Sequence, residues 1–166
     1  RVLFRSEKKI VSVIEKNTLI ERYKVQKKYP STIDIKLLRT EFLAKTFRDG
    51  KIYFIGSNGK LIKEKNIYEE LPFIFGGPST DEFLQFKKII DQSLFSFKSI
   101  NNLFYFSSKR WDIVLKNKIR IKLPKDNTVE ILNNAFKVLK DKRFQNIKTI
   151  DLRIKNQIIL DGWKFR

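Results

Sequence analysis

Carboxylates are the main candidate catalytic groups of this chain, because its 166 residues include no Cys and no His. That composition excludes thiol catalysis, disulfides, zinc fingers and any site built on histidine. Two pairs of neighbouring acids are candidate acid–base groups, Glu69-Glu70 and Asp81-Glu82. Neighbouring acids diverge on a strand, and at a helix start they stabilise the helix dipole, so we interpret both pairs as structural. Two separated carboxylates in one cleft would reopen the hydrolase alternative.

A glycine pair, Gly76-Gly77, is the other motif that could bind a small molecule. It lacks the surrounding residues of a phosphate-binding loop and is typical of a loop that interrupts secondary structure. We therefore predict no enzyme, no cofactor, no metal site and no small-molecule substrate.

The apolar triplet Ile158-Ile159-Leu160 near the end of the chain is the strongest candidate binding feature. We predict a closing strand over Gln157 to Leu160, and in a strand at least one of three consecutive apolar residues faces away from the core. An exposed apolar residue on an edge strand marks an interface or an aggregation hazard. The edge could also accept a strand from another protein.

A net charge of +18, from 36 basic and 18 acidic residues, leaves a nucleic-acid-binding module as the alternative. Lysines are spread along the whole chain, a distribution typical of the composition drift in AT-rich genomes. A nucleic-acid site would need clustered cations and exposed aromatics, and the candidate residues are Lys87, Lys88, Lys98, Lys109 and Arg110 with Phe97, Tyr105 and Phe106.

The first 41 residues predict a helix and a hairpin. Ser6 is a candidate N-cap for a helix over residues 6–17. Strands are predicted over 20–28 and 31–40, joined by a turn at Pro30-Ser31. A helix beside two strands is too small a core to be stable alone.

Residues from 42 onward predict short antiparallel strands and two helices. The turns are predicted at Asp49-Gly50, at 56–59 and at Lys116-Asn117. Predicted strands cover 45–47, 51–55, 60–62, 103–107, both arms of 110–123, 149–153 and 157–160, with an extended apolar stretch at 71–78.

Two helices are expected to cover this sheet. The first begins at Ser79 or Thr80, with Phe83, Phe86 and Ile90 facing inward. The second is predicted to be capped by Asn127, and its inner stripe is Val129, Leu132, Phe136 and Leu139.

The predicted fold class is therefore α+β, with a partial module at residues 1–41 and an antiparallel β-sheet domain with two helices packed on it at 42–166. We expect Trp111 in the core and Asp151 as a structural turn ligand. No run of about 18 apolar residues occurs. Because the chain starts at Arg1 and has no Met, we expect a piece of a longer protein, whose upstream part could hold a membrane anchor.

In order and spacing, several landmarks resemble the extracytoplasmic part of the bacterial cell-division family FtsQ/DivIB. They are residues 29–35 (YPSTIDI), 42–44 (FLA), Asn58-Gly59, Leu71-Pro72 with Gly76, Arg110-Trp111, and 150–153 (IDLR). The resemblance implies that residues 1–41 are a partial POTRA module lacking its first strand and helix, and that 42–166 are the family's β domain.

The resemblance also implies a non-enzymatic divisome scaffold, the periplasmic part of a single-pass inner-membrane protein. Such a scaffold binds the FtsB/FtsL subcomplex, which controls septal peptidoglycan synthesis, by adding a partner strand to its last edge. No nucleic-acid partner is expected from the family.

The partner-binding residues that we predict are Lys109, Arg110, Arg153, Ile154, Asn156, Gln157, Ile158, Ile159, Leu160 and Trp163. The basic residues would hold acidic groups of the partner. The alternative for Arg153 is a surface arginine that neutralises Asp151. Ile154 stands where related proteins often have Tyr, and Trp163 is the candidate replacement for that aromatic anchor.

Overall fold

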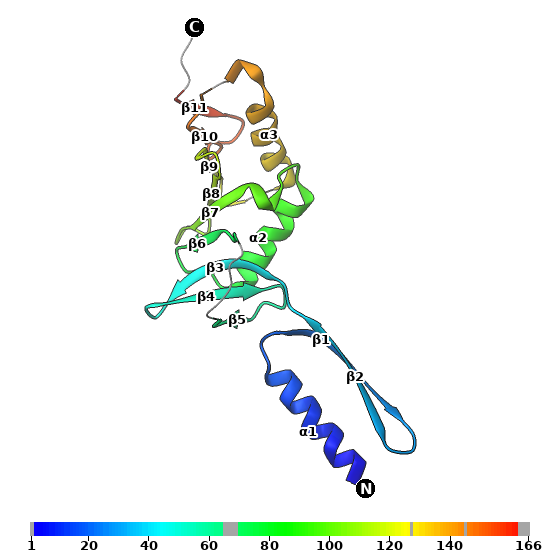
Figure 1. Ribbon diagram of the computed structural model, residues 1–166. Coiled ribbons are helices and arrows are strands. Elements are labelled where there is room, and N and C mark those ends of the chain that lie inside the picture. The colour runs from blue at the N-terminus through cyan, green and yellow to red at the C-terminus, as the bar shows by residue number, and fades with distance from the viewer. Residues whose placement is uncertain (1, 65–69, 127, 145, 163–166) are drawn as a thin grey trace.

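The computed structural model describes residues 2–64, 70–126, 128–144 and 146–162 (Figure 1). Its N-terminal part consists of helix α1 (Val2–Lys16) and a two-stranded sheet of β1 (Ile20–Lys28) and β2 (Thr32–Arg39). The turn falls at residues 29–31, as predicted. The prediction that Ser6 caps α1 is wrong, because the helix begins at Val2 and Ser6 lies inside it.

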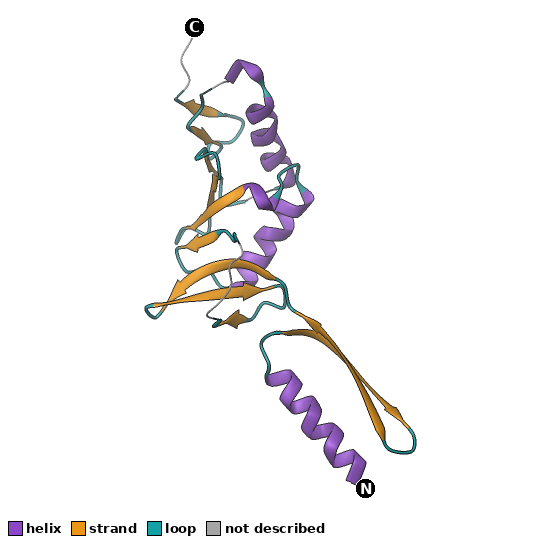
Figure 2. Cartoon of the chain, in the orientation of Figure 1, coloured by secondary structure: helices purple, strands orange, loops and turns teal. Residues whose placement is uncertain are grey.

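The rest of the chain forms one nine-stranded sheet in the order β11-β10-β9-β8-β7-β6-β3-β4-β5 (Figure 2). Five of its strands are short: β6, β9, β10 and β11 have three residues each and β5 has two. The strands are β3 (Phe42–Arg48), β4 (Lys51–Gly56), β5 (Leu61–Ile62), β6 (Phe73–Phe75), β7 (Ile100–Tyr105), β8 (Trp111–Leu115), β9 (Arg120–Lys122), β10 (Thr149–Asp151) and β11 (Ile159–Asp161).

The sheet is mostly antiparallel, and the fold is α+β as predicted. Parallel pairing occurs at three places, between β3 and β6, between β6 and β7, and between β9 and β10. The last two pairs are joined through helices, α2 (Thr80–Gln92) and α3 (Val129–Lys140). A helical crossover brings the chain back to the same end of the sheet, so the strand that follows it runs parallel.

Both helices begin at side-chain caps. Ser79 and Glu82 form a reciprocal capping box at α2, which confirms the structural interpretation of Glu82. At α3 the cap is Thr128, whose hydroxyl accepts from the backbone N–H of Ile131. The prediction that Asn127 is the cap is therefore wrong; Asn127 itself lies outside the described residues.

The core lies between α2, α3 and one face of the sheet (Figure 1). All three predicted inward residues of α2 are buried, as are Leu132 and Ala135 of α3. Trp111 is 4% exposed and stacks on Phe86 with ring centroids 4.7 Å apart, which confirms its predicted core position.

Within the described ranges, no helix is long and apolar enough to cross a membrane. Two 3₁₀ turns, Phe97–Ser99 and Lys142–Phe144, complete the fold.

A polar junction connects the β1-β2 hairpin to the large sheet. The Asn58 amide donates to the carbonyls of Thr18 and Ile20, at 2.9 and 3.2 Å. Ser57 Oγ donates to Glu21 at 2.5 Å and bonds Thr40, which is 4% exposed. Because these bonds join segments about 18 to 40 residues apart, they fix how the hairpin leaves the sheet.

Replacement of Gly76 should destabilise the fold. Gly76 has φ +93°, and an added Cβ would lie 1.8 Å from the carbonyl oxygen of Tyr105 in β7. We expect Gly76→Ala to lower the free energy of unfolding by at least about 2 kcal/mol in chemical denaturation. Gly77→Ala is the matched control, because Gly77 also has positive φ but open space around it. Equal losses in the two variants would contradict the close approach of β6 and β7.

Asn58→Ala should loosen the junction and leave the large sheet folded. We expect faster amide hydrogen exchange at Thr18–Ile20 and Thr40, and little change in the core strands β7 and β8. Asn117→Ala is the control. Asn117 caps its own turn by accepting from Ile119 N–H, as Asn58 does from Lys60, but its side chain bonds no distant segment in the described part of the chain. Identical exchange profiles for the two variants would argue against a junction role for Asn58.

Candidate partner-binding edge

The last strand, β11, lies at one edge of the nine-stranded sheet. It pairs antiparallel with β10 on one side, and no described strand pairs with its other side. The strand is shorter than predicted and begins at Ile159. Residues before it form a turn instead, in which Gln157 N–H donates to the carbonyl of Ile154 and Asn156 has φ +60°. The free edge is therefore Ile159–Asp161.

Apolar side chains at this edge are exposed. Ile158 and Ile159 are 44% and 47% exposed, and Ile154 in the preceding turn is 51% exposed. Leu160 points the other way and packs partly against the core. The prediction that the apolar triplet exposes at least one residue is confirmed. An exposed isoleucine beside unpaired backbone groups is the combination that favours strand addition.

Arg153 forms an ion pair with Asp151. Its Nη2 lies 2.6 Å from Oδ2 of Asp151, its Nε bonds the same carboxylate, and its backbone N–H donates to Oδ1 at 3.1 Å. These hydrogen bonds hold the pKa of Asp151 below its usual range and raise the pKa of Arg153. Asp151 is thus a turn ligand, as predicted. Arg153 neutralises it, yet 42% of the arginine side chain stays exposed to a partner.

A buried carboxylate, Asp112, lies in β8, which β9 and β10 separate from the edge strand, and it is 1% exposed. Burial raises the pKa of Asp112, and the positive charges of Arg110, Arg120, Lys122 and Arg153 oppose that rise. Arg110 Nε lies 3.9 Å from Asp112 Oδ1, and neither atom has a hydrogen-bond partner among the described residues. The Arg110 guanidinium instead stacks over Phe106 at 4.1 Å. The structure therefore brings Arg110 and Arg153 around one buried acid.

Lys109 lies elsewhere, in the tight turn before β8, where its φ is +63°. It lines a hollow with Glu82 and Tyr105, whose hydroxyl donates to the Glu82 carboxylate. That hydrogen bond is the main cause that lowers the pKa of Glu82, and Lys109 adds to it. Of the predicted basic pair, Arg110 alone faces Asp112. The predicted Trp163 lies outside the described residues.

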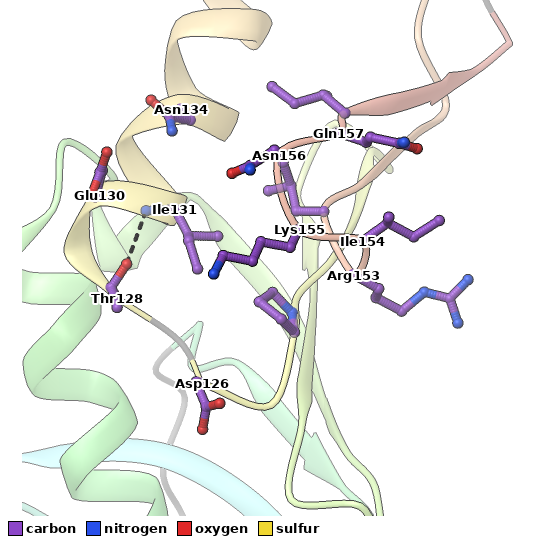
Figure 3. Close-up of a pocket in the computed structure, with 13 residues that line it drawn as sticks. Asp126, Thr128, Glu130, Ile131, Asn134, Arg153, Ile154, Lys155, Asn156 and Gln157 are labelled. Carbon is purple, nitrogen blue, oxygen red and sulfur yellow. Dashed lines mark hydrogen bonds between the residues drawn. The ribbon is translucent and has the colours of Figure 1, made fainter.

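A pocket of about 620 Å³ separates the start of α3 from residues 152–158 (Figure 3). Lys155 extends across it toward Thr128 and Ile131, whereas Arg153 and Ile154 point away from α3. Predicted residues that line it are Arg153, Ile154, Asn156, Gln157 and Ile158. The pocket is polar at the helix start and apolar at Ile131 and Leu152. It is adjacent to the free edge, so a partner strand could place a side chain in it.

Sequence reasoning missed three contributors to this region. Ile131 and Asn134 line the pocket from α3, and Lys155 spans it. The helical period could have placed Ile131 and Asn134 near one another, since they are three residues apart. No local pattern brings α3 next to residues 152–158, because that contact depends on the parallel pairing of β9 and β10. Within the described ranges, no three acidic residues gather to hold a metal ion.

Asp151 and Asp112 should respond to acid in opposite directions. The lowered pKa of Asp151 stabilises the fold above its ordinary value of 3.8, and this stabilisation is lost as pH falls through the folded-state pKa. The raised pKa of Asp112 stabilises the fold below 3.8, and this contribution is lost as pH rises through the folded-state pKa.

Denaturation of two variants at several pH values tests this assignment. Asp151→Asn should cost more free energy of unfolding at neutral pH than in acid, because only the ionised group bonds Arg153. Asp112→Asn should cost more in acid than at neutral pH, because it removes a group whose protonation favours the fold. The same pH trend in both variants would show that the environment described for Asp151 or for Asp112 is incorrect.

Comparisons with known proteins agree with this architecture. The family description "Cell division protein FtsQ/DivIB, C-terminal" matches residues 46–153. Cell division protein FtsQ of Rickettsia bellii is 28% identical over 166 residues, covering 90% of this chain and 57% of the relative. FtsQ of Bartonella bacilliformis is 26% identical over 154 residues, covering 88% of this chain and 49% of the relative.

The chain thus spans about half the length of the curated relatives that it matches. The family match covers more than half of the chain, from within β3 to the Asp151–Arg153 pair, and includes β4 to β10, α2 and α3 but not β11. On this evidence, the chain belongs to the FtsQ/DivIB family of cell division proteins.

Proposed function

We propose that this region is a non-enzymatic divisome scaffold that binds an FtsB/FtsL-like subcomplex by strand addition at β11. One observation carries the proposal: in a chain of the FtsQ/DivIB family, the last described strand lies at a sheet edge, with its Ile159 and the preceding Ile158 exposed. Binding there would help control septal peptidoglycan synthesis, as the family resemblance implies. No chemical step is required of any residue.

The proposed site has three parts. The free edge of Ile159–Asp161 supplies backbone hydrogen bonds, and Ile158 and Ile159 supply apolar contact. Three residues form few such bonds, each worth about 1 kcal/mol, so the edge alone gives weak binding. The pocket beside α3 and the exposed part of Arg153 must therefore add selectivity and affinity.

We also propose a division of the chain and a location. Residues 1–41 are part of a POTRA-type module, and residues 42–166 are the family's β domain. The two separate sheets support this division. The region lies on the periplasmic side of the inner membrane, and the longer protein is anchored by a single span. The greater length of the relatives supports an additional segment.

Ile159→Lys should weaken partner binding more than folding. Titration with an FtsB-like periplasmic peptide at physiological salt should give an affinity about tenfold lower or worse, because a lysine replaces an apolar contact at the edge. Ile52→Lys is the matched control: Ile52 is an equally exposed strand isoleucine, 50% exposed in β4, far along the sheet order from β11. It should change the affinity less than about twofold.

Two outcomes would contradict strand addition at β11. One is an equal loss of binding and of unfolding free energy in Ile159→Lys. The other is the absence of peptide binding together with steeply salt-dependent binding of a DNA oligonucleotide, which would support the nucleic-acid alternative.

A further inference from the structure

The sheet face opposite α2 and α3 carries a row of aromatic and charged side chains. Phe75, Phe104, Asp112 and Lys122 are in register across β6, β7, β8 and β9. Residues in register share a face, and their chain neighbours Ile74, Leu103 and Ile113 point into the core. Figure 1 shows both helices on the core side of these strands and no helix on the other. We call this second side the open face.

Aromatic rings form a stack on the open face. Phe75 lies 4.8 Å from Phe104 with the rings 13° from parallel, and 4.7 Å from Phe73. Phe75 is 42% exposed although it belongs to a central strand. Central strands are ordinarily covered on any apolar face, so a stack of this kind marks a surface that another molecule covers.

The charge available on the open face is positive. Arg120 lies over the Phe104 ring at 5.1 Å, and Lys122 is two residues along the same strand. A guanidinium group that lies over an aromatic ring keeps its N–H donors free at the edge of its own plane, where they can bind carboxylates. Of the acids on this face, Asp112 is buried and Asp151 is held by Arg153, whereas Asp161 lies in β11, two strands away from Arg120.

The pairing of the strands limits which kind of partner can cover this face. Strands β6 to β9 are paired on both sides, so they cannot accept an added strand. A helix can cover such a face instead, as the amphipathic helices α2 and α3 do on the opposite face of the sheet. A second copy of this chain is disfavoured, since two surfaces of a molecule with net charge +18 repel one another.

We propose that the open face binds an acidic amphipathic helix of a protein partner. Its apolar stripe would cover Phe75 and Phe104, and its flanking carboxylates would bind Arg120 and Lys122. This site goes beyond strand addition, because it uses no group of β11 and can hold even if the edge binds nothing.

Titration with designed peptides tests the proposal on the whole chain. The probe is a roughly 18-residue helix with leucines along one side and glutamates beside them, compared with the same helix carrying lysines in place of the glutamates. We expect the glutamate helix alone to bind. The double variant Phe75→Ser/Phe104→Ser, and separately Arg120→Glu, should each weaken that binding about tenfold or more.

Matched controls lie on the helix side of the molecule. Leu94→Ser removes an equally exposed apolar side chain, 54% exposed, and Lys88→Glu reverses an exposed charge on α2. Both should leave binding unchanged. The double variant Phe75→Ser/Phe104→Ser should in turn leave binding of the FtsB-like peptide at β11 unchanged, which separates this proposal from strand addition. Denaturation midpoints show whether each variant is folded, and Arg120→Glu keeps the test valid if the double serine variant unfolds.

Three results would overturn the proposal. Equal binding of the glutamate and lysine helices would remove the charge argument. Binding unaffected by Arg120→Glu would place the helix elsewhere. Tighter, salt-sensitive binding of single-stranded DNA or anionic lipid vesicles, lost in the open-face variants, would mean that the face recognises a different class of molecule.

Discussion

Burial of one face of the nine-stranded sheet beneath α2 and α3 is the constraint on which the rest of the structure depends. Phe83, Phe86 and Ile90 of α2 pack on that face with Leu103 and Ile113 of the sheet. Each helix also connects two parallel strands as a crossover. The packing of the helices on this face therefore determines which strands lie side by side. That order brings β10 beside β9 and leaves β11 without a second neighbour among the described strands. The core and the free edge therefore have the same origin.

The two ends of the sheet differ in what they expose. At one end β5 has only two residues, and Ile62 there is 2% exposed. At the other end β11 exposes Ile159 beside a pocket and a partly exposed arginine. Natural sheets ordinarily protect their edges with short strands, charges or coverings. This contrast supports the proposed binding at β11, where the short strand lies beside the pocket and the exposed part of Arg153.

Local sequence patterns predicted most of the elements. The Asp49-Gly50 and Lys116-Asn117 turns, the α2 capping box and the core position of Trp111 all follow from short-range chemistry, and the structure shows them. The start of α1 was mispredicted because a good capping residue, Ser6, also tolerates a helix interior. The α3 cap was misplaced by one residue, since Asn and Thr both cap well.

Long-range arrangement was harder to predict. The pocket depends on α3 lying beside residues 152–158, and no periodicity in either segment encodes that contact. Alternation in β8 places Asp112 on the side away from the helices, yet Asp112 is 1% exposed, and four cations act on its carboxylate. The exposed aromatic stack combines β6 with β7, whose parallel pairing is visible only once α2 is known to be a crossover.

Amide hydrogen exchange at β11, with and without an FtsB-like periplasmic peptide, tests the central claim most directly. We expect outward-facing amides within Ile159–Asp161 to become protected when the peptide binds, because an added strand hydrogen-bonds to them. Unchanged exchange at β11 under saturating peptide, with protection appearing elsewhere in the sheet, would contradict it.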